Sequence, residues 1–394
     1  MNKRRVDPGI ELRAKSKRRR TKSEVYVFCV LLVALSFLLY ALSLEAAVTG
    51  NCVNCHTMHN SQDNLPMANR VFSGGSVTTS ETPQSHLLRG NCIGCHSDNL
   101  NNSILTLDSV KYPIVYSIGG DPSNPLAGGN FRTVVITGNV YGHNVAGIAS
   151  ADTLSTPPGF VVATKPSAFT PTGSVWGPSS WTGHQVTCAG EYGCHGARFP
   201  EYDDYAGVKG GHHGNKSSFA DLDGKTVGKS YRFLAGIRGA EESLWEQMNS
   251  STRHNGYYGV TTYGGETDTI SYLCGECHGN FHASGQVGSS SPWLRHPADF
   301  AFSGVRNGMN GGYTNSEYAF YNSPDTNKYS TLAPVAETSP STNSETVGSG
   351  SIVMCLSCHR AHASLNFKIM RWNYKSSTLS EALSGCNVCH TLKN

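Results

Sequence analysis

Five short motifs of the form Cys-x-x-Cys-His constrain this chain more than any other feature. They begin at Cys52, Cys92, Cys274, Cys355 and Cys386. Two cysteines three positions apart on one helical turn face the same way, and each can form a thioether with a haem vinyl group. The histidine that follows then points its imidazole at the iron. Neither a disulfide framework nor a zinc site requires a histidine after every second cysteine, so the motifs predict covalently attached haem.

Two further cysteines stand in the sequence CAGEYGCHG, residues 188–196. Cys194 and His195 form the usual second half of a motif, but five residues separate Cys194 from Cys188 instead of two. Three interpretations remain: a sixth haem with a stretched loop, a haem held by Cys194 alone, or a disulfide or structural site without haem. Gly190 and Gly193 favour the first, because they would let the longer loop bulge away from the porphyrin.

The sequence therefore predicts six haems c, each with two thioether cysteines and one proximal histidine as iron ligand. The thioether cysteines are Cys52, Cys55, Cys92, Cys95, Cys188, Cys194, Cys274, Cys277, Cys355, Cys358, Cys386 and Cys389. The proximal histidines are His56, His96, His195, His278, His359 and His390.

Ten of the 16 histidines lie outside these motifs. A haem whose iron binds two histidines has no open position for a substrate, so this surplus favours an electron-transfer protein over an enzyme. His59 and His362 follow a proximal histidine by three residues, which is too close to reach the opposite face of the same haem, so each is expected to serve a neighbouring haem. The distal ligands predicted are His59, His86, His143, His213, His296 and His362, with His184, His212, His254 and His282 as alternatives.

The N-terminal region predicts export. Residues 1–24 carry ten Lys or Arg, and residues 25–44 are almost wholly apolar, as in a membrane-inserting segment with its positive side in the cytoplasm. A nucleic-acid-binding tail is disfavoured because the apolar run follows directly. Cleavage near Ala46 is favoured over a retained anchor, in which case the membrane is contacted only before cleavage. The predicted division is a basic head and export signal, 1–46, and a hexahaem domain, 47–394.

Composition predicts an irregular fold. Only 38% of residues are apolar and 43 are glycine, too few apolar side chains for a large protein core. The porphyrins would supply the missing apolar surface, so we expect mostly coil, with few short helices and strands wrapped around a stacked haem chain. Within it we expect a strand-like run at 132–140, helices at 239–248 and 379–383, and a surface loop at 330–350. Removing residues 1–46 leaves 21 basic and 24 acidic residues, a formal charge of −3.

Several segments agree with known proteins beyond the haem motif itself. CVNCHTMHNS, GHNV, LRHPAD, CLSCHRAHAS and CNVCHTLKN together resemble the OmcS-like family of outer-surface hexahaem cytochromes that polymerise into extracellular nanowires. The resemblance implies histidine ligation of every iron, haems stacked in alternating parallel and T-shaped pairs, and a head-to-tail homopolymer. It also implies that His59 binds a haem of the next subunit, most plausibly the one on Cys355, Cys358 and His359.

The resemblance implies an extracellular filament that carries electrons to other cytochromes or external acceptors. The alternative is a membrane-anchored periplasmic relay, as a quinol dehydrogenase or the partner of a reductase. A multihaem reductase with one open iron is a third class.

Overall fold

The structure is a computed structural model that describes residues 50–161, 177–214, 218–260, 267–283, 287–289, 291–302, 321 and 328–390. By its internal contacts the chain divides into two units, Met1–Ala46 and Ala47–Asn394. The expected basic head and export segment lie outside the described residues. Among the helices of the described ranges, none is both long and apolar enough to cross a membrane.

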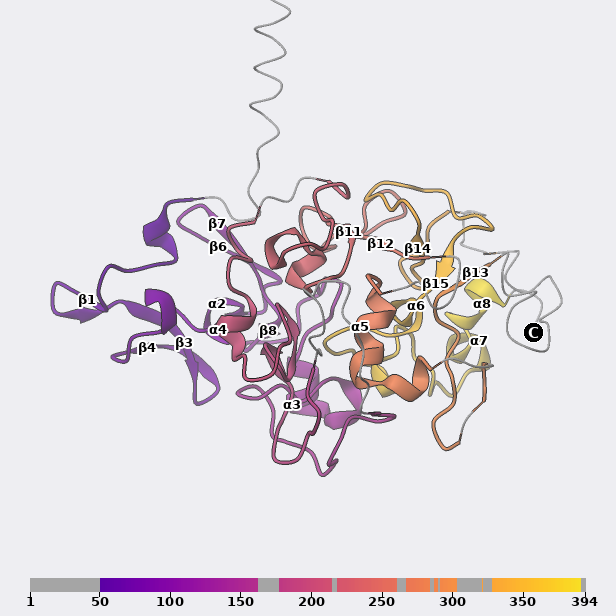
Figure 1. The fold of residues 1–394 in the computed structure, drawn as a ribbon, viewed down its shortest axis with the longest axis horizontal. Helices are drawn as coiled ribbons and strands as arrows, with labels where there is room; N and C mark the ends of the chain where they lie inside the picture. The colour runs from indigo at the N-terminus through magenta and orange to yellow at the C-terminus, as the bar shows by residue number, and fades with distance from the viewer. Residues whose placement is uncertain are drawn as a thin grey trace, which may run out of the picture. The chain divides into compact units, whose positions relative to one another are not determined.

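The second unit is built from short elements joined by irregular segments, as the composition predicts (Figure 1). The α-helices are α2 (Cys92–Cys95), α3 (Arg132–Thr137), α4 (Asp204–Gly207), α5 (Ile270–Cys277), α6 (Cys355–Cys358), α7 (Leu379–Ala382) and α8 (Cys386–Cys389). The 3-10 helices are η1 (Cys52–Asn54), η2 (Ser85–Leu87), η3 (Asn139–Tyr141), η4 (Val227–Lys229), η5 (Tyr231–Phe233), η6 (Gly279–Phe281) and η7 (Phe367–Ile369).

The strands are equally short. They are β1 (Ser61–Gln62), β2 (Leu65–Pro66), β3 (Ala68–Ser73), β4 (Ser76–Ser80), β5 (Ser97–Asp98), β6 (Ile104–Leu107), β7 (Val110–Pro113), β8 (Tyr116–Ser117), β9 (Thr187–Ala189), β10 (Gly193–His195), β11 (Gly239–Ala240), β12 (Gly256–Tyr258), β13 (Phe300–Ala301), β14 (Ala336–Glu337) and β15 (Ile352–Val353).

One sheet among the described residues has more than two strands, in the order β11-β12-β14-β15-β13. Its β12 and β14 are parallel and the other neighbours are antiparallel. The remaining strands form two-stranded pairs, including the hairpins β3-β4 and β6-β7.

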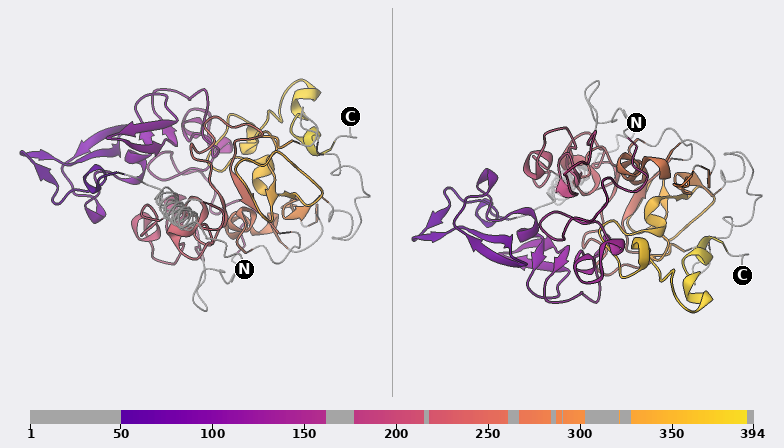
Figure 2. Two further views of the ribbon diagram at one scale, coloured as in Figure 1. Left: turned by 90° about the horizontal axis from the view of Figure 1, so that it is seen from above. Right: turned by 90° about the horizontal axis from the view of Figure 1, so that it is seen from below.

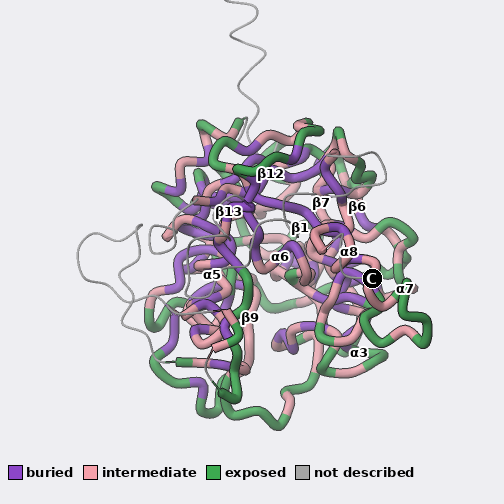
Figure 3. The backbone as a smooth tube through the Cα atoms, turned by 90° about the vertical axis from the view of Figure 1, so that its right-hand side faces the viewer, coloured by how far each residue is buried: buried purple, intermediate pink, exposed green. Residues whose placement is uncertain are grey.

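Apolar side chains gather in several small clusters instead of one core. One lies around the five-stranded sheet and includes Tyr257 and Ile352 with Leu273 of α5 and Leu356 of α6. Another gathers Phe131, Val134, Val145 and Ala363. Buried backbone threads between exposed loops in Figure 3 instead of filling a continuous interior. Figures 1 and 2 place the hairpins β1-β2 and β3-β4 at one end of the second unit and the C-terminal helices α7 and α8 at the other.

Two expectations about local structure were wrong. The β-branched run at 132–140 forms α3 and η3 instead of a strand, because Val134 packs beside Phe131 and Ala363 and Gly138, at φ 112°, ends the helix. Tertiary packing here overrides the strand propensity of the sequence.

The acid-rich stretch 239–248 also departs from its expected helix. The carboxylate of Glu242 accepts the backbone N–H groups of Leu244 and Glu246, which folds the chain back into a turn, and Trp245 and Glu246 take positive φ values of 52° and 62°. The Glu242 carboxylate thus takes backbone N–H groups that a helix would use, and the chain turns instead.

The Ser/Thr-rich stretch 330–350 is not simply a surface loop, since β14 lies within it and Ala333, Val335 and Val347 are buried. The short helix expected at 379–383 is confirmed as α7.

Candidate haem sites

The five regular motifs share one local geometry. In each, the backbone N–H of the histidine donates to the carbonyl of the first cysteine, at 2.7–3.1 Å. That bond closes a helical turn, which forms η1, α2, α6, α8 and the C-terminal end of α5. The N-cap side chains Asn91 and Thr269 support the turns of α2 and α5 by accepting a backbone N–H. A single turn keeps both cysteines on one side, as two thioethers to one porphyrin require.

The third site replaces the helical turn with two strands. β9 and β10 pair in parallel with Ala189 opposite His195, so Cys188 stands opposite Cys194 despite the five residues between them. The two thiols lie within electrostatic reach of each other, and neither is in a disulfide. The loop depends on Gly190, which has φ +74° and whose added Cβ would lie 2.4 Å from a backbone oxygen. The stretched motif therefore brings its two sulfurs together as the regular motifs do.

The motif histidines present one ring nitrogen to the backbone. In five of the six, Nδ1–H can donate to a carbonyl oxygen at 2.8–3.0 Å, and His143 and His296 do the same at 2.8 Å. This bond selects the tautomer with a lone pair on Nε2, the atom that binds iron. The acceptors for the five motif histidines belong to His86, Pro113, Arg232, Pro158 and Lys368.

Three of these acceptors lie in one recurring turn. η2, η5 and η7 each have a basic central residue with positive φ: His86 at 59°, Arg232 at 50° and Lys368 at 60°. The carbonyl of this residue accepts Nδ1–H of His56, His195 and His359, respectively. The first, third and fifth sites therefore orient their motif histidine with the same kind of 3-10 turn.

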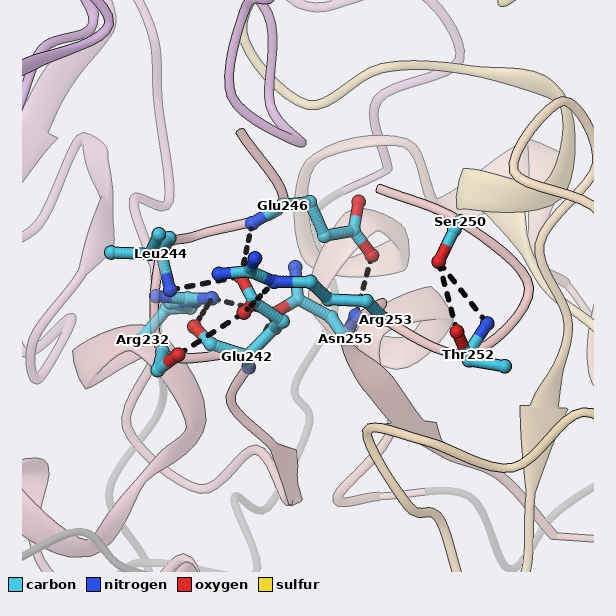
Figure 4. A network of polar contacts seen from close by, with 9 residues as sticks. Arg232, Glu242, Leu244, Glu246, Ser250, Thr252, Arg253 and Asn255 are labelled. Atoms are coloured by element: carbon cyan, nitrogen blue, oxygen red, sulfur yellow. Dashed lines mark hydrogen bonds and ion pairs between the residues drawn. The ribbon is translucent and has the colours of Figure 1, made fainter. Parts of the chain in front are cut away.

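The Arg232 turn is held by the polar network in Figure 4. The backbone N–H of Arg232 donates to Glu241 at 2.7 Å, and its guanidinium donates to the side chain of Asn255 at 2.5 Å. Asn255 in turn accepts the backbone N–H of Glu242 and donates its own N–H to Glu246. The network fixes the carbonyl that orients His195.

Four motif histidines face a second imidazole. The ring centroids are 6.0 Å apart for His56 and His213, 6.2 Å for His96 and His212, 6.3 Å for His195 and His362, and 6.2 Å for His278 and His143.

The separation does fit a metal ion between them. With each Nε2 about 2 Å from the iron and about 1.15 Å from its own ring centroid, two opposed imidazoles have centroids about 6.3 Å apart. The residues of these four sites therefore fit a haem with two histidine ligands.

Burial favours the neutral form of His96, His143, His278 and His362 among these imidazoles. It lowers the pKa of His278 to about 4 and that of His362 to about 3, with neighbouring histidines adding to the shift. The pKa values of His96, His143 and His359 are also lowered, chiefly by burial. A neutral imidazole is the form that binds a metal ion.

Two of the expected distal positions differ in the structure. His212, which had been an alternative to its neighbour His213, lies opposite His96, so both members of the pair face a motif histidine. His86 is exposed, its ring faces no other histidine among the described residues, and it contributes its backbone carbonyl instead. The sequence signal for this arrangement was the adjacency of residues 212 and 213, since two neighbouring histidine rings can each face a motif histidine of a different site.

The remaining expected distal ligands, His59 and His296, face no second imidazole within the described part of this chain, and the ring of His296 lies 4.7 Å from that of Phe281. His59 is exposed, beside Met58, whose side chain is 91% exposed. His296 is exposed and interacts electrostatically with His359 and His278.

The other three alternatives are engaged elsewhere. His184 stacks on Tyr192 with centroids 4.0 Å apart. Both ring nitrogens of His254 lie within hydrogen-bond distance of backbone carbonyls. Nε2 of His282 is hydrogen-bonded to the carboxylate of Asp299, and both side chains are buried.

The thiols of successive motifs lie near one another. Each pair below interacts electrostatically, and one pair is hydrogen-bonded, so cysteines of successive motifs are neighbours. The contacts are Cys55 with Cys95, Cys92 with Cys188, Cys194 with Cys274, Cys274 with Cys355 by a hydrogen bond, and Cys358 with Cys386.

Several of the motif thiols have raised pKa values, whereas a hydrogen bond from Cys274 lowers the pKa of Cys355. Burial raises the pKa of Cys92 to about 12 and that of Cys95 to about 11. Cys358 and Cys389 also reach about 12 for the same reason. A buried thiol that stays protonated suits an uncharged thioether better than a thiolate site.

Comparison with known proteins confirms the predicted resemblance. No family model matches the chain. The sequence is 25% identical over 405 residues to the C-type cytochrome OmcS of Geobacter sulfurreducens, an alignment that covers 90% of this chain and 86% of OmcS.

Two solved structures of the OmcS filament, also from Geobacter sulfurreducens, match 88% of this chain and the whole of theirs, at 18% and 20% identity. Their TM-score of 0.41 is too low to define the fold of this chain.

Proposed function

We propose that this protein is an exported electron-transfer cytochrome that holds six haems c, each iron bound by two histidines, and that it polymerises into an extracellular filament. The observation that carries the proposal is the set of four imidazole pairs with centroids 6.0–6.3 Å apart. Bound haem supplies one-electron exchange between ferric and ferrous iron, and a pair of histidine ligands leaves no position for a substrate.

The chain's own residues would do three things at each site. Two cysteines attach the group, a motif histidine and a distant histidine hold the iron, and a backbone carbonyl orients the motif imidazole. The proposed pairs are His56 with His213, His96 with His212, His195 with His362, and His278 with His143. The stretched loop at Cys188 and Cys194 serves the third site in the same way.

The last two sites need ligands from His296 and His59. His362 follows the fifth motif histidine by three residues and faces the motif histidine of the third site, two sites earlier. His59 follows the first motif histidine by the same three residues. If subunits follow one another head to tail, counting back two sites from the first site reaches the fifth site of the neighbouring subunit. We therefore propose that His59 binds the iron of that fifth site. By elimination, His296 remains as the proposed ligand of the sixth iron.

This arrangement supports a head-to-tail polymer. The hairpin β1-β2, which begins two residues after the exposed His59, and the C-terminal helices α7 and α8 lie at opposite ends of the second unit (Figures 1 and 2). A contact between different surfaces of two copies that does not close into a ring builds an open helix. The six sites in sequence order would then continue from one subunit into the next.

The relative OmcS is named as a C-type cytochrome, and its two solved structures are named as an outer membrane cytochrome filament and as nanowires. Carried to this chain, this supports an extracellular filament that delivers electrons to other cytochromes or external acceptors. Residues 1–46 would act as the export signal and be absent from the filament.

Electron microscopy of sheared cell-surface material, combined with peptide mass analysis, tests the proposal. We expect filaments whose subunit begins near residue 47 and carries six haems. Finding the protein only in the inner membrane, with residues 1–46 retained, would support the membrane-anchored relay instead.

A further inference from the structure

A buried ion pair joins the third site to the fourth. Nε of Arg198 lies 2.6 Å from Oε2 of Glu276, and Nη2 lies 3.0 Å from Oε1, so the contact is bidentate. The two side chains are only 4% and 5% exposed. Arg198 follows His195 by three residues, and Glu276 stands inside the fourth motif, directly before Cys277. The pair therefore links two attachment segments that are 78 residues apart.

Arg198 is held in place by the third motif as well. Its guanidinium donates to the carbonyls of Cys194 at 3.3 Å, Gly196 at 3.2 Å and Ala235 at 3.4 Å. These bonds fix the position of the positive charge relative to the backbone of the third site. A rigid bidentate arginine is suited to holding a buried carboxylate at a defined place.

Both charges act on the junction between the two sites. The Cys194 thiol of the third site interacts electrostatically with Arg198 and with Glu276, in opposite directions. The same thiol lies within electrostatic reach of Cys274 of the fourth site. Charges in a buried, low-dielectric region interact far more strongly than charges in water.

We infer that Arg198 and Glu276 are positioning residues that together set the reduction potentials of the third and fourth haems. The inference rests on the electron-transfer function proposed above. A positive charge near an iron favours the ferrous state, because reduction removes one unit of positive charge, and a carboxylate favours the ferric state. As a pair the two charges largely cancel, so neither potential is displaced, while the contact holds the two attachment segments together.

Three variants of the purified holoprotein test this, with each haem potential resolved in a redox titration. In Glu276→Gln the arginine charge stands alone, and we expect two of the six potentials to rise. In Arg198→Gln the carboxylate stands alone, and the same two potentials should fall. In the double variant they should return close to those of the unmodified protein.

For each single variant we expect about a tenfold change in the ferrous-to-ferric ratio at a given potential, which is ~59 mV for one electron. Potentials that shift in opposite directions in the two single variants, and that return in the double variant, indicate an effect of charge. A contact with a purely structural role would shift the potentials in the same direction in both single variants. Arg198→Lys keeps the charge but loses the bidentate contact, so it should leave the two potentials unchanged while lowering the unfolding temperature. If Glu276→Gln fails to fold, the comparison of Arg198→Gln with Arg198→Lys still separates an effect of charge from an effect of structure.

Asp121→Asn is the matched control. It removes the partly exposed ion pair between Arg132 and Asp121, 3.4 Å long, and should move no potential. In a protein that holds six haems, potentials that shift in the same direction in both single variants, or that shift in neither, would overturn the inference. Fewer than six haems in the unmodified protein would instead contradict the proposed function, so the two failures are distinguishable.

Discussion

The backbone N–H of His143 donates to the carbonyl oxygen of His362 at 3.0 Å, and Nδ1–H of His143 donates to the neighbouring carbonyl of Ala361 at 2.8 Å. The rings that face His278 and His195 are thus fixed to one another. Because residues 361 and 362 directly follow the fifth motif, one short segment organises the third, fourth and fifth sites. The proposed ligands of three irons are therefore coupled through a few backbone bonds.

Gly128 tests this coupling. A Cβ at this position would lie 2.7 Å from Nδ1 of His362, and the Gly128 carbonyl accepts the backbone N–H of His362 at 2.7 Å. We expect Gly128→Ala to push the His362 imidazole away and to convert one of six irons from low spin to high spin. Electron paramagnetic resonance of the oxidised protein measures this. Gly348→Ala, where a Cβ meets nothing within 4 Å, is the control and should leave every iron low spin.

The role proposed for His59 predicts an assembly defect. We expect His59→Ala to give folded subunits with normal secondary structure that do not form filaments, because the fifth iron of the neighbouring subunit loses its ligand. Electron microscopy detects the filaments, and analytical ultracentrifugation detects the unassembled subunits. His86→Ala removes another exposed ring and should still polymerise. Normal filaments from the His59 variant would exclude an intersubunit ligand at this position.

The stretched third motif predicts an attachment that depends on its loop. Gly190→Ala forces a side chain into φ +74° and to within 2.4 Å of a backbone oxygen, so Cys188 should no longer reach its place opposite Cys194. Peptide mass analysis should then find the third haem missing or linked to Cys194 alone. Gly183→Ala has nearly the same φ, +77°, with nothing within 4 Å, and should keep both links. An unmodified protein with only five haems would refute this site.

The sheet cluster predicts the ordinary cost of a core cavity. Ile352 in β15 is fully buried, so Ile352→Ala should lower the free energy of unfolding by about 2–5 kcal/mol. Leu379→Ala, at a side chain that is 72% exposed, should change it by less than about 0.5 kcal/mol. Thermal unfolding followed by circular dichroism compares them. Equal effects in the two variants would mean that the porphyrins, and not this cluster, dominate the stability of the region.

Local chemistry was readable from the sequence, whereas distant pairings were not. A Cys-x-x-Cys-His motif forms its own turn, so the helical attachment segments follow from a few adjacent residues. The pairing of His143 with His278 joins positions 135 residues apart, and no periodicity indicates it. The sequence also did not indicate that His212 and His213 face different motif histidines.

The errors in secondary structure have a related cause. The run at 132–140 has strand propensity but buries Val134 in a helix, and the acids at 241, 242 and 246 cap turns instead of opening a helix. In a chain whose short segments pack against one another and around the proposed haems, tertiary contacts outweigh local preference.

The spin state of all six irons in the oxidised protein tests the central claim most directly. Electron paramagnetic resonance, calibrated by the haem count from intact mass, should show six low-spin ferric irons and no high-spin signal, and added cyanide should not change the spectrum. A high-spin iron that binds cyanide or turns over a substrate in the intact assembly would contradict the account, because it would show an iron that two imidazoles do not enclose.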